Sequence, residues 1–422
     1  MSNQTINTNT TVAKILLITA AAIIVLAAFY VINWGFGNAV AERSDSIELD
    51  EIALRMAPSD PLPHSHIASR LNNTFVAADA DRALFEYELA AELSPNNYLA
   101  WLAVGSARER KGDTAKAEAA FRYAEKLAPN YTQTQWMLGN FLLRQNKADE
   151  AFAEIQKAVI SDPRYSAPAA VAAMQFFSND LELSAKALGN TPISDAELAV
   201  IAAGQNRYDE ALNIWNKIPV EERTELKTQG EKITAAALSA KKYRDVLYIN
   251  NSIGSEINAE TGKIYNGGFE NKILPEAAKL FDWQITNGTT PVIGLSDSEK
   301  HSGNYGLAMV FNSPNGSIDR TISQTIAVEP NSSYRFEMFY KSKINSGPHI
   351  FWEILNAEDN TTLASSSPLS AAENWTPMSA DLSIPENSDG IILRVSVEKC
   401  AALDCQLIGA VWFDDLRLTK LK

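Results

Sequence analysis

The sequence predicts a multidomain protein in which an N-terminal transmembrane helix precedes an all-α helical-repeat solenoid and a C-terminal all-β jelly-roll sandwich. Three observations lead to this fold class. An uncharged apolar run lies near the N-terminus, prolines and small residues then recur at a constant spacing, and after Gly262 apolar residues alternate with polar ones. These patterns are typical of a membrane span, of stacked helix pairs and of β-strands.

Length and charge restrict the class of protein. The chain has 422 residues, which is too many for one ordinary hydrophobic core. Its formal net charge is −14 and its pI is about 4.9. A surface with this charge repels phosphate backbones, so nucleic acid is not expected as a partner.

The N-terminal apolar run predicts a membrane anchor. No charged residue occurs from Ile15 to Ala41, and the strongly apolar part, Ile15 to Trp34, has the roughly 20 residues that cross a bilayer. We therefore predict a cytoplasmic tail over 1–14 and a transmembrane helix over 15–34. The alternative is a cleaved secretory signal, because Ala39-Val40-Ala41 fits an A-x-A cleavage site.

Whether the apolar run is a membrane anchor or a cleaved signal, we expect the rest of the chain to be exported. Lys14 precedes the span and an acid-rich segment follows it, so the positive-inside rule favours a cytoplasmic N-terminus. We expect a single-pass protein of the inner (plasma) membrane whose bulk lies in the periplasm or extracytoplasmic space.

The segment after the span is a 34-residue repeat. Pro95, Pro129 and Pro163 end successive units, and Gly105 and Gly139 share one position. The other aligned positions are Ala83, Ala117 and Ala151, then Tyr87, Phe121 and Ile155, then Ala90, Ala124 and Ala158. Small residues let paired helices approach closely, and proline cannot continue a helix. We predict helical repeats over 45–252.

This pattern resembles the tetratricopeptide repeat, W-x2-L-G…A-x3-F-x2-A-x4-P. The resemblance implies a concave face that binds a protein partner. Stepping by the repeat period places six residues on it: Leu99, Leu102, Glu109, Gln133, Trp136 and Asn140. Trp136 lies one residue past the position equivalent to Trp101 and is expected to point away from the core. The alternative is that it packs on a neighbouring repeat or on the C-terminal domain.

Residues 260–422 are predicted to form a β-sandwich. The runs YRFEMFY, HIFWEIL, IILRVSV and AVWFDDLRL alternate in polarity and are separated by turn residues. Six segments in order along the chain resemble the galactose-binding-domain-like jelly rolls, which include carbohydrate-binding modules of families 4, 9 and 22: NGGFE, FDW, HSGNYGLAM, SQTIAVEPNSSYRFEMFYKS, NWTPMSADLSIP and VWFDDLRL. The resemblance implies a glycan-binding module whose first strand is IYNGGFE, residues 264–270.

The same resemblance implies one structural calcium and no other cofactor. In that family, an acid of the first strand and an acid of the last strand often meet at the ion. Carried over, the side-chain ligands are Glu270 with Asp414 or Asp415, and carbonyl groups around Lys300 and Ser302 complete the shell. The alternative is that Glu270 only hydrogen-bonds a loop and Asp415 caps a strand end.

Strand parity predicts which side chains leave the core. Tyr334, Phe336, Met338 and Tyr340 share the inner face of their strand, and Phe339 lies on the outer one. The resulting open face, expected to bind glycan or a protein partner, comprises Arg335, Phe339, Lys341, His349, Phe351 and Arg394. The resemblance assigns structural positions to Trp283, Trp375 and Trp412.

The sequence shows no catalytic constellation. Neither cysteine has a nucleophile context, and the neighbouring acids Asp414 and Asp415 are expected on opposite faces of a strand, where they cannot flank one glycosidic bond. In an oxidising compartment Cys400 and Cys405 are expected to form a disulfide.

We therefore predict a non-enzymatic, membrane-anchored scaffold. Its solenoid binds a protein partner and its sandwich binds glycan, in a setting such as the assembly of a cell-surface polysaccharide or envelope structure. One alternative is a purely structural or protein-binding protein without sugar binding. The other is an accessory factor in polysaccharide degradation.

Overall fold

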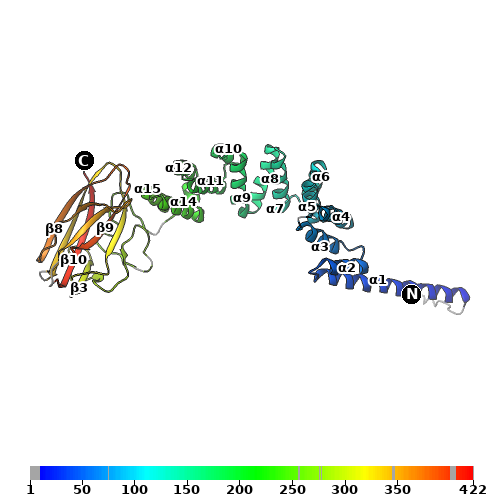
Figure 1. Ribbon diagram of the computed structural model, residues 1–422, viewed down its shortest axis with the longest axis horizontal. Helices are drawn as coiled ribbons and strands as arrows, with labels where there is room; N and C mark the ends of the chain where they lie inside the picture. The colour runs from blue at the N-terminus through cyan, green and yellow to red at the C-terminus, as the bar shows by residue number, and fades with distance from the viewer. Residues whose placement is uncertain are drawn as a thin grey trace, which may run out of the picture. The chain divides into compact units, whose positions relative to one another are not determined.

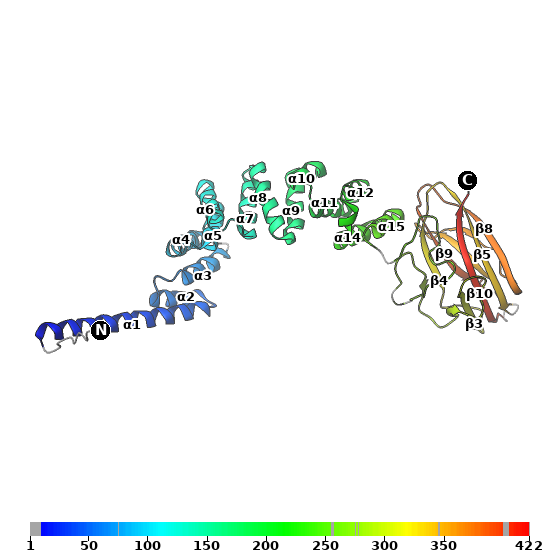
Figure 2. The ribbon, with the colours of Figure 1, turned by 180° about the vertical axis from the view of Figure 1, so that it is seen from behind.

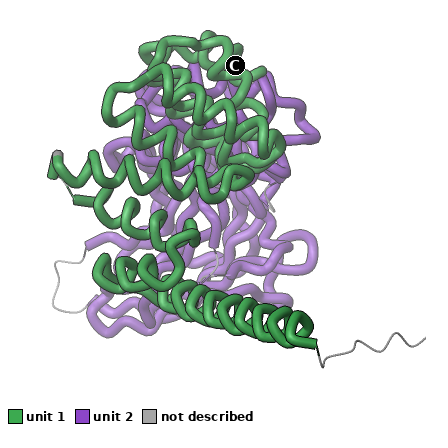
Figure 3. Tube along the Cα trace, turned by 90° about the vertical axis from the view of Figure 1, so that its right-hand side faces the viewer, with its two compact units in different colours: residues 1–189 green, residues 190–422 purple. Residues whose placement is uncertain are grey.

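A computed structural model describes residues 10–421, with positions 75, 255–256, 275, 277, 345–346 and 400–404 outside the described part. It contains one long apolar helix, a region of shorter helices and a C-terminal antiparallel two-sheet β-sandwich (Figures 1 and 2). The predicted fold class is confirmed. The chain divides into two compact units, residues 1–189 and 190–422 (Figure 3).

The first helix, α1 (Thr11–Glu42), contains the predicted span and continues past it. It is long and apolar enough to cross a membrane, a property that signal sequences share. Its apolar side chains are exposed from Val12 to Ile32, whereas Gly37 and Ala41 near its end are buried.

The first unit continues with short helices in antiparallel pairs. They are α2 (Ile47–Met56), α3 (Pro61–Asn72), α4 (Ala77–Leu93), α5 (Tyr98–Arg110), α6 (Thr114–Leu127), α7 (Thr132–Arg144), α8 (Ala148–Ser161), the 3₁₀ turn η1 (Pro163–Tyr165), α9 (Ser166–Phe176) and α10 (Leu181–Ala187). The helices α5, α7 and α9 begin at Tyr98, Thr132 and Ser166, each one repeat period after the last, so the structure follows the repeat in the sequence.

The repeated residues make repeated contacts. A Cβ atom on Gly105 would lie 2.9 Å from the ring of Phe121, and one on Gly139 would lie 2.8 Å from Ile155. The glycines therefore make room for the large residue of the partner helix. The Nε1 group of Trp101 donates to the carbonyl of Pro95 at 2.9 Å, and in the next repeat the Nε2 group of Gln135 donates to that of Pro129 at 2.7 Å.

The second unit begins with further helices. They are α11 (Pro192–Gly204), α12 (Tyr208–Trp215), α13 (Val220–Arg223), α14 (Lys227–Ser239) and α15 (Tyr243–Ser252). The helices end where the predicted repeat region of 45–252 ends. The two compact units, however, divide within that region, after Gly189, so the last helices belong to the same unit as the sandwich.

The sandwich consists of two five-stranded sheets, ordered β1-β4-β9-β6-β7 and β2-β3-β10-β5-β8. The strands are β1 (Gln284–Ile285), β2 (Val292–Ser296), β3 (Gly306–Ser313), β4 (Ile322–Ala327), β5 (Ser333–Ile344), β6 (Ile350–Asn356), β7 (Thr362–Ser365), β8 (Ala372–Ser383), β9 (Gly390–Val397) and β10 (Leu407–Lys420). The inner faces of both sheets meet around Trp283, Trp352 and Phe413, which are fully buried. The predicted inner row of β5 is buried as expected.

The segment IYNGGFE is a turn-rich loop, and the prediction that it forms the first strand is wrong. Asn266 and Phe269 have φ angles of 49° and 57°, in the left-handed region that an extended strand excludes. The segment is instead fastened to the last strand, because the amide of Leu416 donates to the carbonyl of Gly267 at 2.9 Å. The first strand, β1, begins only at Gln284.

Helix α15 packs on the sandwich through its first turn. The Asp389 carboxylate accepts the amide N–H groups of Tyr243 at 3.0 Å and Arg244 at 3.2 Å, so a sandwich loop caps a helix that has no cap of its own. The Tyr243 hydroxyl donates to the carbonyl of Ala357 at 3.1 Å. A Cβ atom on Gly390 would overlap the Tyr243 ring, so glycine makes room for it.

Replacing Asp389 with alanine is expected to lower the stability of the second unit by about 1 kcal/mol, the usual effect of removing a helix N-cap. The physical reason is that two amide N–H groups of α15 lose their acceptor. Urea unfolding of the full-length chain measures the change. Asn387→Ala, at an exposed position of the same loop, is the control. Equal stability of both variants would contradict the capping role.

Candidate functional site

The outer face of the sheet β2-β3-β10-β5-β8 carries a group of aromatic side chains. Phe339 lies on β5, Trp412 on β10 and Trp375 on β8, and His301 reaches the same face from the loop between β2 and β3. We call these four residues the aromatic platform. Since β8 and β10 flank β5, the strands of the two tryptophans lie two inter-strand spacings apart, about 9.5 Å.

Three rings of the platform, those of His301, Phe339 and Trp375, contact one another. The His301 ring stacks on Phe339 with centroids 3.8 Å apart and an interplanar angle of 11°. Trp375 meets the His301 ring edge-on, with centroids 5.8 Å apart. Trp412 lies on the other side of β5, and its ring centroid is 5.8 Å from the ammonium group of Lys343, a residue of β5. His301 is exposed and the other three residues are half-buried, so the platform offers flat, partly apolar surfaces to a ligand.

Two acids of β10 hold His301 in place. The Asp414 carboxylate accepts the amide N–H groups of His301 at 2.7 Å and Ser302 at 3.0 Å. The Asp415 carboxylate lies 2.7 Å from Nδ1 of His301 and accepts the Ser302 hydroxyl at 3.0 Å. The side chain that stacks on Phe339 is therefore fixed at its backbone and at its ring.

The expectation that Asp414 and Asp415 point to opposite faces is wrong. A β-bulge interrupts the pairing of β10 with β5 after Asp414, and Asp415 has a φ angle of 53°. An extra residue at a bulge changes the alternation of side chains, so both carboxylates bind one loop. Asp414 is completely buried beneath that loop, which keeps its carboxylate away from any ligand on the face.

The two acids differ in their titration. Burial raises the pKa of Asp414, and hydrogen bonds from Ser302 and His301 offset part of that rise. Burial alone would also raise the pKa of Asp415, but hydrogen bonds from His301 and Ser302 and the charge of Arg417 hold that pKa below its ordinary value. Asp415 is thus the ionised partner of the His301 ring.

Glu270 fastens the other end of the same loop. One carboxylate oxygen accepts the amide N–H groups of Asn304 at 2.8 Å and Tyr305 at 3.2 Å, and the other accepts the Asn304 side-chain amide at 3.0 Å. A Cβ atom on Gly303 would overlap the Glu270 carboxylate. These contacts match the alternative in which Glu270 hydrogen-bonds a loop.

In this arrangement, the carboxylates that are predicted to bind calcium accept hydrogen bonds from N–H and O–H donors. Lys300 and Ser302 lie in the loop that Glu270, Asp414 and Asp415 hold, so the structure does bring the five predicted residues to one loop. Among the described residues, however, no three His, Cys, Asp or Glu side chains form a group that could hold a metal ion. The donor set as placed does not fit calcium, which requires six or more oxygens.

The calcium prediction is checked by thermal unfolding with added calcium and with a chelator. The hydrogen-bonded loop leads us to expect the same melting temperature in both. A melting temperature that rises with calcium concentration would show that the loop rearranges around the ion, because a ligand that binds only the folded state stabilises it.

Replacing Glu270 with glutamine is expected to lower the melting temperature at pH 7 and to have little effect in acid. The amides of Asn304 and Tyr305 hold the pKa of Glu270 below its ordinary value of 4.5. A carboxylate with a lowered pKa stabilises the fold above that ordinary value, and this contribution disappears as the pH falls through the folded-state pKa. Melting curves from pH 7 to pH 3 test this. Glu386→Gln, at an exposed loop position, is the control. A pH-independent difference would contradict the linkage.

The remaining charges of this face are mostly paired. Lys341 binds Glu299 at 2.6 Å, and Arg335 binds Asp381 at 2.7 Å through a two-pronged contact. The face around the platform therefore offers aromatic rings and neutralised charges rather than one strong field.

The predicted open face is divided between the two sheets. Arg335, Phe339 and Lys341 lie on β5, whereas His349 and Phe351 lie beside or on β6 of the other sheet. Arg394, on β9 of that other sheet, binds Glu353 at 2.8 Å. The prediction of one face is therefore corrected. Parity separates inward from outward side chains, but it does not say which sheet a strand joins.

The repeat residues expected on a concave face have mixed environments. Leu102 is a core residue at 2% exposure, so its placement on the face is wrong, whereas Leu99 is 47% exposed. Gln133 is exposed and Glu109 binds Arg144 at 2.6 Å. Trp136 is half-buried against Tyr165 of η1, with centroids 5.1 Å apart, and its carbonyl accepts the Asn140 side-chain amide. Trp136 thus packs on the following repeat.

The predicted disulfide remains a prediction. Cys405 is buried just before β10, and Cys400 lies outside the described residues.

Sequence reasoning missed three of the four platform residues. The family resemblance assigns structural positions to Trp412 and Trp375, yet Trp412 alternates with the buried residues Val411 and Phe413 and therefore points outward. Parity along VWFDDLRL could have found it. No local signal places His301 over Phe339, because the contact joins a loop to a strand far along the chain.

Comparison with known proteins finds solved structures that are similar to the β-sandwich and others that are similar to the helical repeats. No protein-family model and no curated protein matches this chain. A solved structure described as "CBM4 structure and function" is 16% identical, with a TM-score of 0.29, and the match covers 37% of this chain and 99% of that one. The N-terminal xylanase 10B modules CBM22-1 and GH10 of Clostridium thermocellum, complexed with xylohexaose, are 16% identical with a TM-score of 0.28, and the match covers 39% of this chain and 29% of that one.

The helical part has its own likeness. YrrB, described as a TPR protein with an unusual peptide-binding site, is 17% identical with a TM-score of 0.26, and the match covers 49% of this chain and 92% of that one. The resemblances noted in the sequence, to tetratricopeptide repeats and to carbohydrate-binding modules, thus recur among solved structures. At these identities and scores, the ligands of those proteins say nothing about this one. The class of protein rests on its own fold, which combines helical repeats with a β-sandwich.

Proposed function

We propose that this protein is a membrane-anchored, non-enzymatic scaffold whose sandwich binds glycan on the aromatic platform and whose helical repeats bind a protein partner. The observation that supports glycan binding is the stacked pair of His301 and Phe339 beside Trp375, with Trp412 across β5. The flat apolar faces of pyranose rings pack on such side chains. Polar neighbours such as Lys341 and Glu299 suit sugar hydroxyl groups.

Affinity electrophoresis of the full-length chain in detergent tests the glycan part. Each gel contains xylan, a β-glucan or alginate. The mobility of each variant in that gel is compared with the mobility of the same variant in a gel without polysaccharide. We expect retardation by at least one of them, weakened about tenfold or more by Trp375→Ala or Trp412→Ala, which corresponds to about 1.4 kcal/mol. Phe351→Ala, on the other sheet, is the matched control and should change nothing.

The result also separates the alternatives. If no polysaccharide retards the chain, or if Phe351→Ala weakens retention as much as Trp375→Ala, glycan binding by the platform fails. Loss of a protein partner in pull-downs with the tryptophan variants would then favour the purely protein-binding alternative. Retention together with stimulation of a polysaccharide hydrolase would favour the accessory role in degradation.

The protein partner is proposed to contact the exposed residues of the repeats. Leu99 and Gln133 are accessible on α5 and α7, whereas Leu102 and Trp136 contribute to packing. Pull-downs with Leu99→Asp and Gln133→Lys should lose a partner that Phe351→Ala retains. Equal capture by all three variants would contradict this surface.

Retention of α1 as an anchor is supported by its last turns. Ala41, the residue before the candidate cleavage point, is fully buried within the helix. We propose a single-pass inner-membrane protein with its N-terminus inside and its bulk in the periplasm, possessing no cleaved signal. Sequencing of the mature N-terminus tests this, because a chain that begins at Glu42 would contradict the anchor.

A further inference from the structure

The end of α1 is packed against the turn between α2 and α3. On α1, covered residues recur on one side of the helix at Asn33, Gly37 and Ala41, and a Cβ atom on Gly37 would lie 2.7 Å from that of Ala57. The Asn38 side-chain amide donates to the Asp60 carboxylate at 2.9 Å. The contact begins at Tyr30, whose hydroxyl lies 3.2 Å from that of Ser59.

These contacts place the turn at a defined level along α1. Tyr30 precedes Trp34, the expected end of the span, by four residues, and an α-helix rises about 1.5 Å per residue. Ser59 therefore lies about 6 Å before the level at which the apolar run ends. A turn fastened there to an anchored helix reaches the depth of the lipid headgroups.

The exposed side chains of the turn are uncharged, as contact with the lipid headgroup region favours. Between Met56 and Pro63 the sequence is MAPSDPLP, with one ionisable side chain. That side chain, Asp60, is only 3% exposed and is satisfied by Asn38 and by the amide of Leu62 at 3.0 Å. Pro58 and Ser59 are exposed. The surface of the turn is therefore uncharged, which lowers the cost of contact with lipid.

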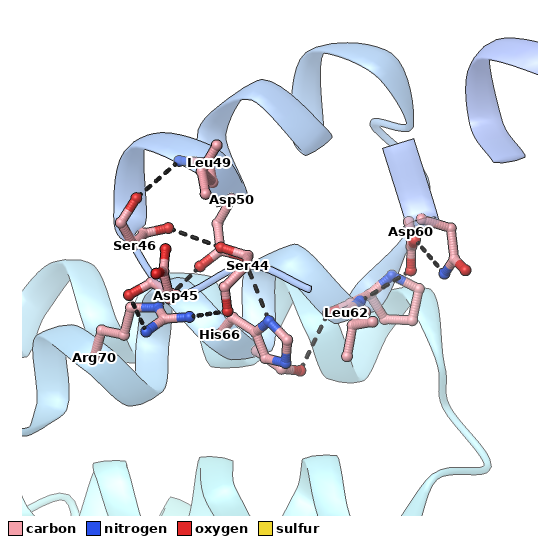
Figure 4. A network of polar contacts seen from close by, with 12 residues as sticks. Ser44, Asp45, Ser46, Leu49, Asp50, Asp60, Leu62, His66 and Arg70 are labelled. Atoms are coloured by element: carbon pink, nitrogen blue, oxygen red, sulfur yellow. Dashed lines mark hydrogen bonds and ion pairs between the residues drawn. The ribbon is translucent and has the colours of Figure 1, made fainter. Parts of the chain in front are cut away.

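The connection between α1 and α2 is bound to α3 through Arg70. The Arg70 guanidinium donates to the carbonyl groups of Ser44 at 2.7 Å and Asp45 at 2.9 Å and to the carboxylate of Asp50 at 3.0 Å (Figure 4). Asp50 is fully buried, and His66 lies 3.4 Å from its other oxygen. A charge-assisted network of this kind is a strong constraint.

We propose that the turn Met56–Leu62 (defined here as the interfacial turn) inserts into the lipid headgroup region beside α1. The inference rests on the proposed membrane anchorage of α1. It assigns a lipid surface as the partner of this turn and fixes the first helix pair at the membrane, so that the remaining repeats begin next to the bilayer.

Photo-crosslinking tests the proposal on the full-length chain in vesicles of phosphatidylethanolamine and phosphatidylglycerol. Benzoylphenylalanine is introduced at Ile24 in the span, at Ser59 or Pro58 in the interfacial turn, and at Asn130, which is exposed between α6 and α7. We expect lipid adducts at Ile24 and at both turn positions, each several-fold above the yield at Asn130. The two turn positions guard against a single variant that fails to fold.

The outcomes separate this inference from the anchor. Adducts at Ile24, with yields at Ser59 and Pro58 no greater than at Asn130, would overturn the interfacial turn and leave the anchor standing. Absence of adducts at Ile24 would overturn the anchor and the interfacial turn together.

Discussion

Replacing Trp352 with alanine is expected to destabilise the sandwich by about 3–5 kcal/mol, the range for large aromatic residues in a core. Trp352 is fully buried on β6. Its ring meets those of Trp283, Phe336 and Phe413, with centroids 5.9, 6.0 and 5.3 Å apart, so the variant leaves a cavity where the two sheets meet. Urea unfolding of the full-length chain, followed by near-ultraviolet circular dichroism, measures the loss.

Two variants serve as controls. Trp375→Ala, on the outer face, should leave stability nearly unchanged while weakening retention in polysaccharide gels. Trp352→Phe should cost much less than alanine, because the Trp352 indole N–H has no hydrogen-bond partner among the described residues and phenylalanine removes that unsatisfied donor. Similar losses for Trp352→Ala and Trp375→Ala would contradict the assignment of the two faces.

Replacing Gly267 with alanine is expected to destabilise the sandwich by about 3 kcal/mol or more, as overpacking against backbone does when the neighbour cannot move. The new Cβ atom would overlap the carbonyl oxygen of Leu416, which belongs to β10. The amide of that same residue donates to Gly267, so the Cβ atom and the hydrogen bond cannot both be accommodated. Thermal unfolding of the full-length chain measures the change.

The adjacent glycine provides the matched control. A Cβ atom on Gly268 would find only the Glu270 side chain, at 4.0 Å. Gly268→Ala should therefore be neutral or slightly stabilising, since alanine reduces the entropy of the unfolded chain. If the two variants unfold at the same temperature, the close approach of this segment to β10 does not contribute to stability.

The predicted binding face combines residues from two opposite faces of the sandwich. Phe339 and Phe351 are both outward residues on strands that follow one another in the chain, yet β5 and β6 belong to opposite sheets. The outer face that contains Phe351 also receives α15, because Tyr243 packs with Ala327 and Ile392 of β4 and β9. The aromatic platform lies on the other sheet and is the better candidate for a ligand.

Much of this fold could be read from local sequence. A constant repeat period specifies where helices begin, because glycine or alanine in one helix and a large residue in its partner must meet in every repeat, as Gly105 and Phe121 do. Alternation identifies the buried rows of strands, and the length of an uncharged apolar run predicts α1. The repeat period, the alternation and the length of the apolar run can each be read from residues that are close together in the sequence.

The arrangement of the site depends on pairing between distant segments, which no local pattern encodes. The bulge in β10 turns Asp415 toward the same loop as Asp414, and together they bring His301 onto Phe339. The segment IYNGGFE forms a turn, in which the amide of Phe269 donates to the carbonyl of Asn266 at 3.1 Å, and the carbonyl of Gly267 within it pairs with β10, the last strand of the chain. The alternation of apolar and polar residues predicts which side chains of a strand are buried. Hydrogen bonding between distant strands determines which sheet the strand joins, and therefore on which face of the sandwich its outward side chains lie.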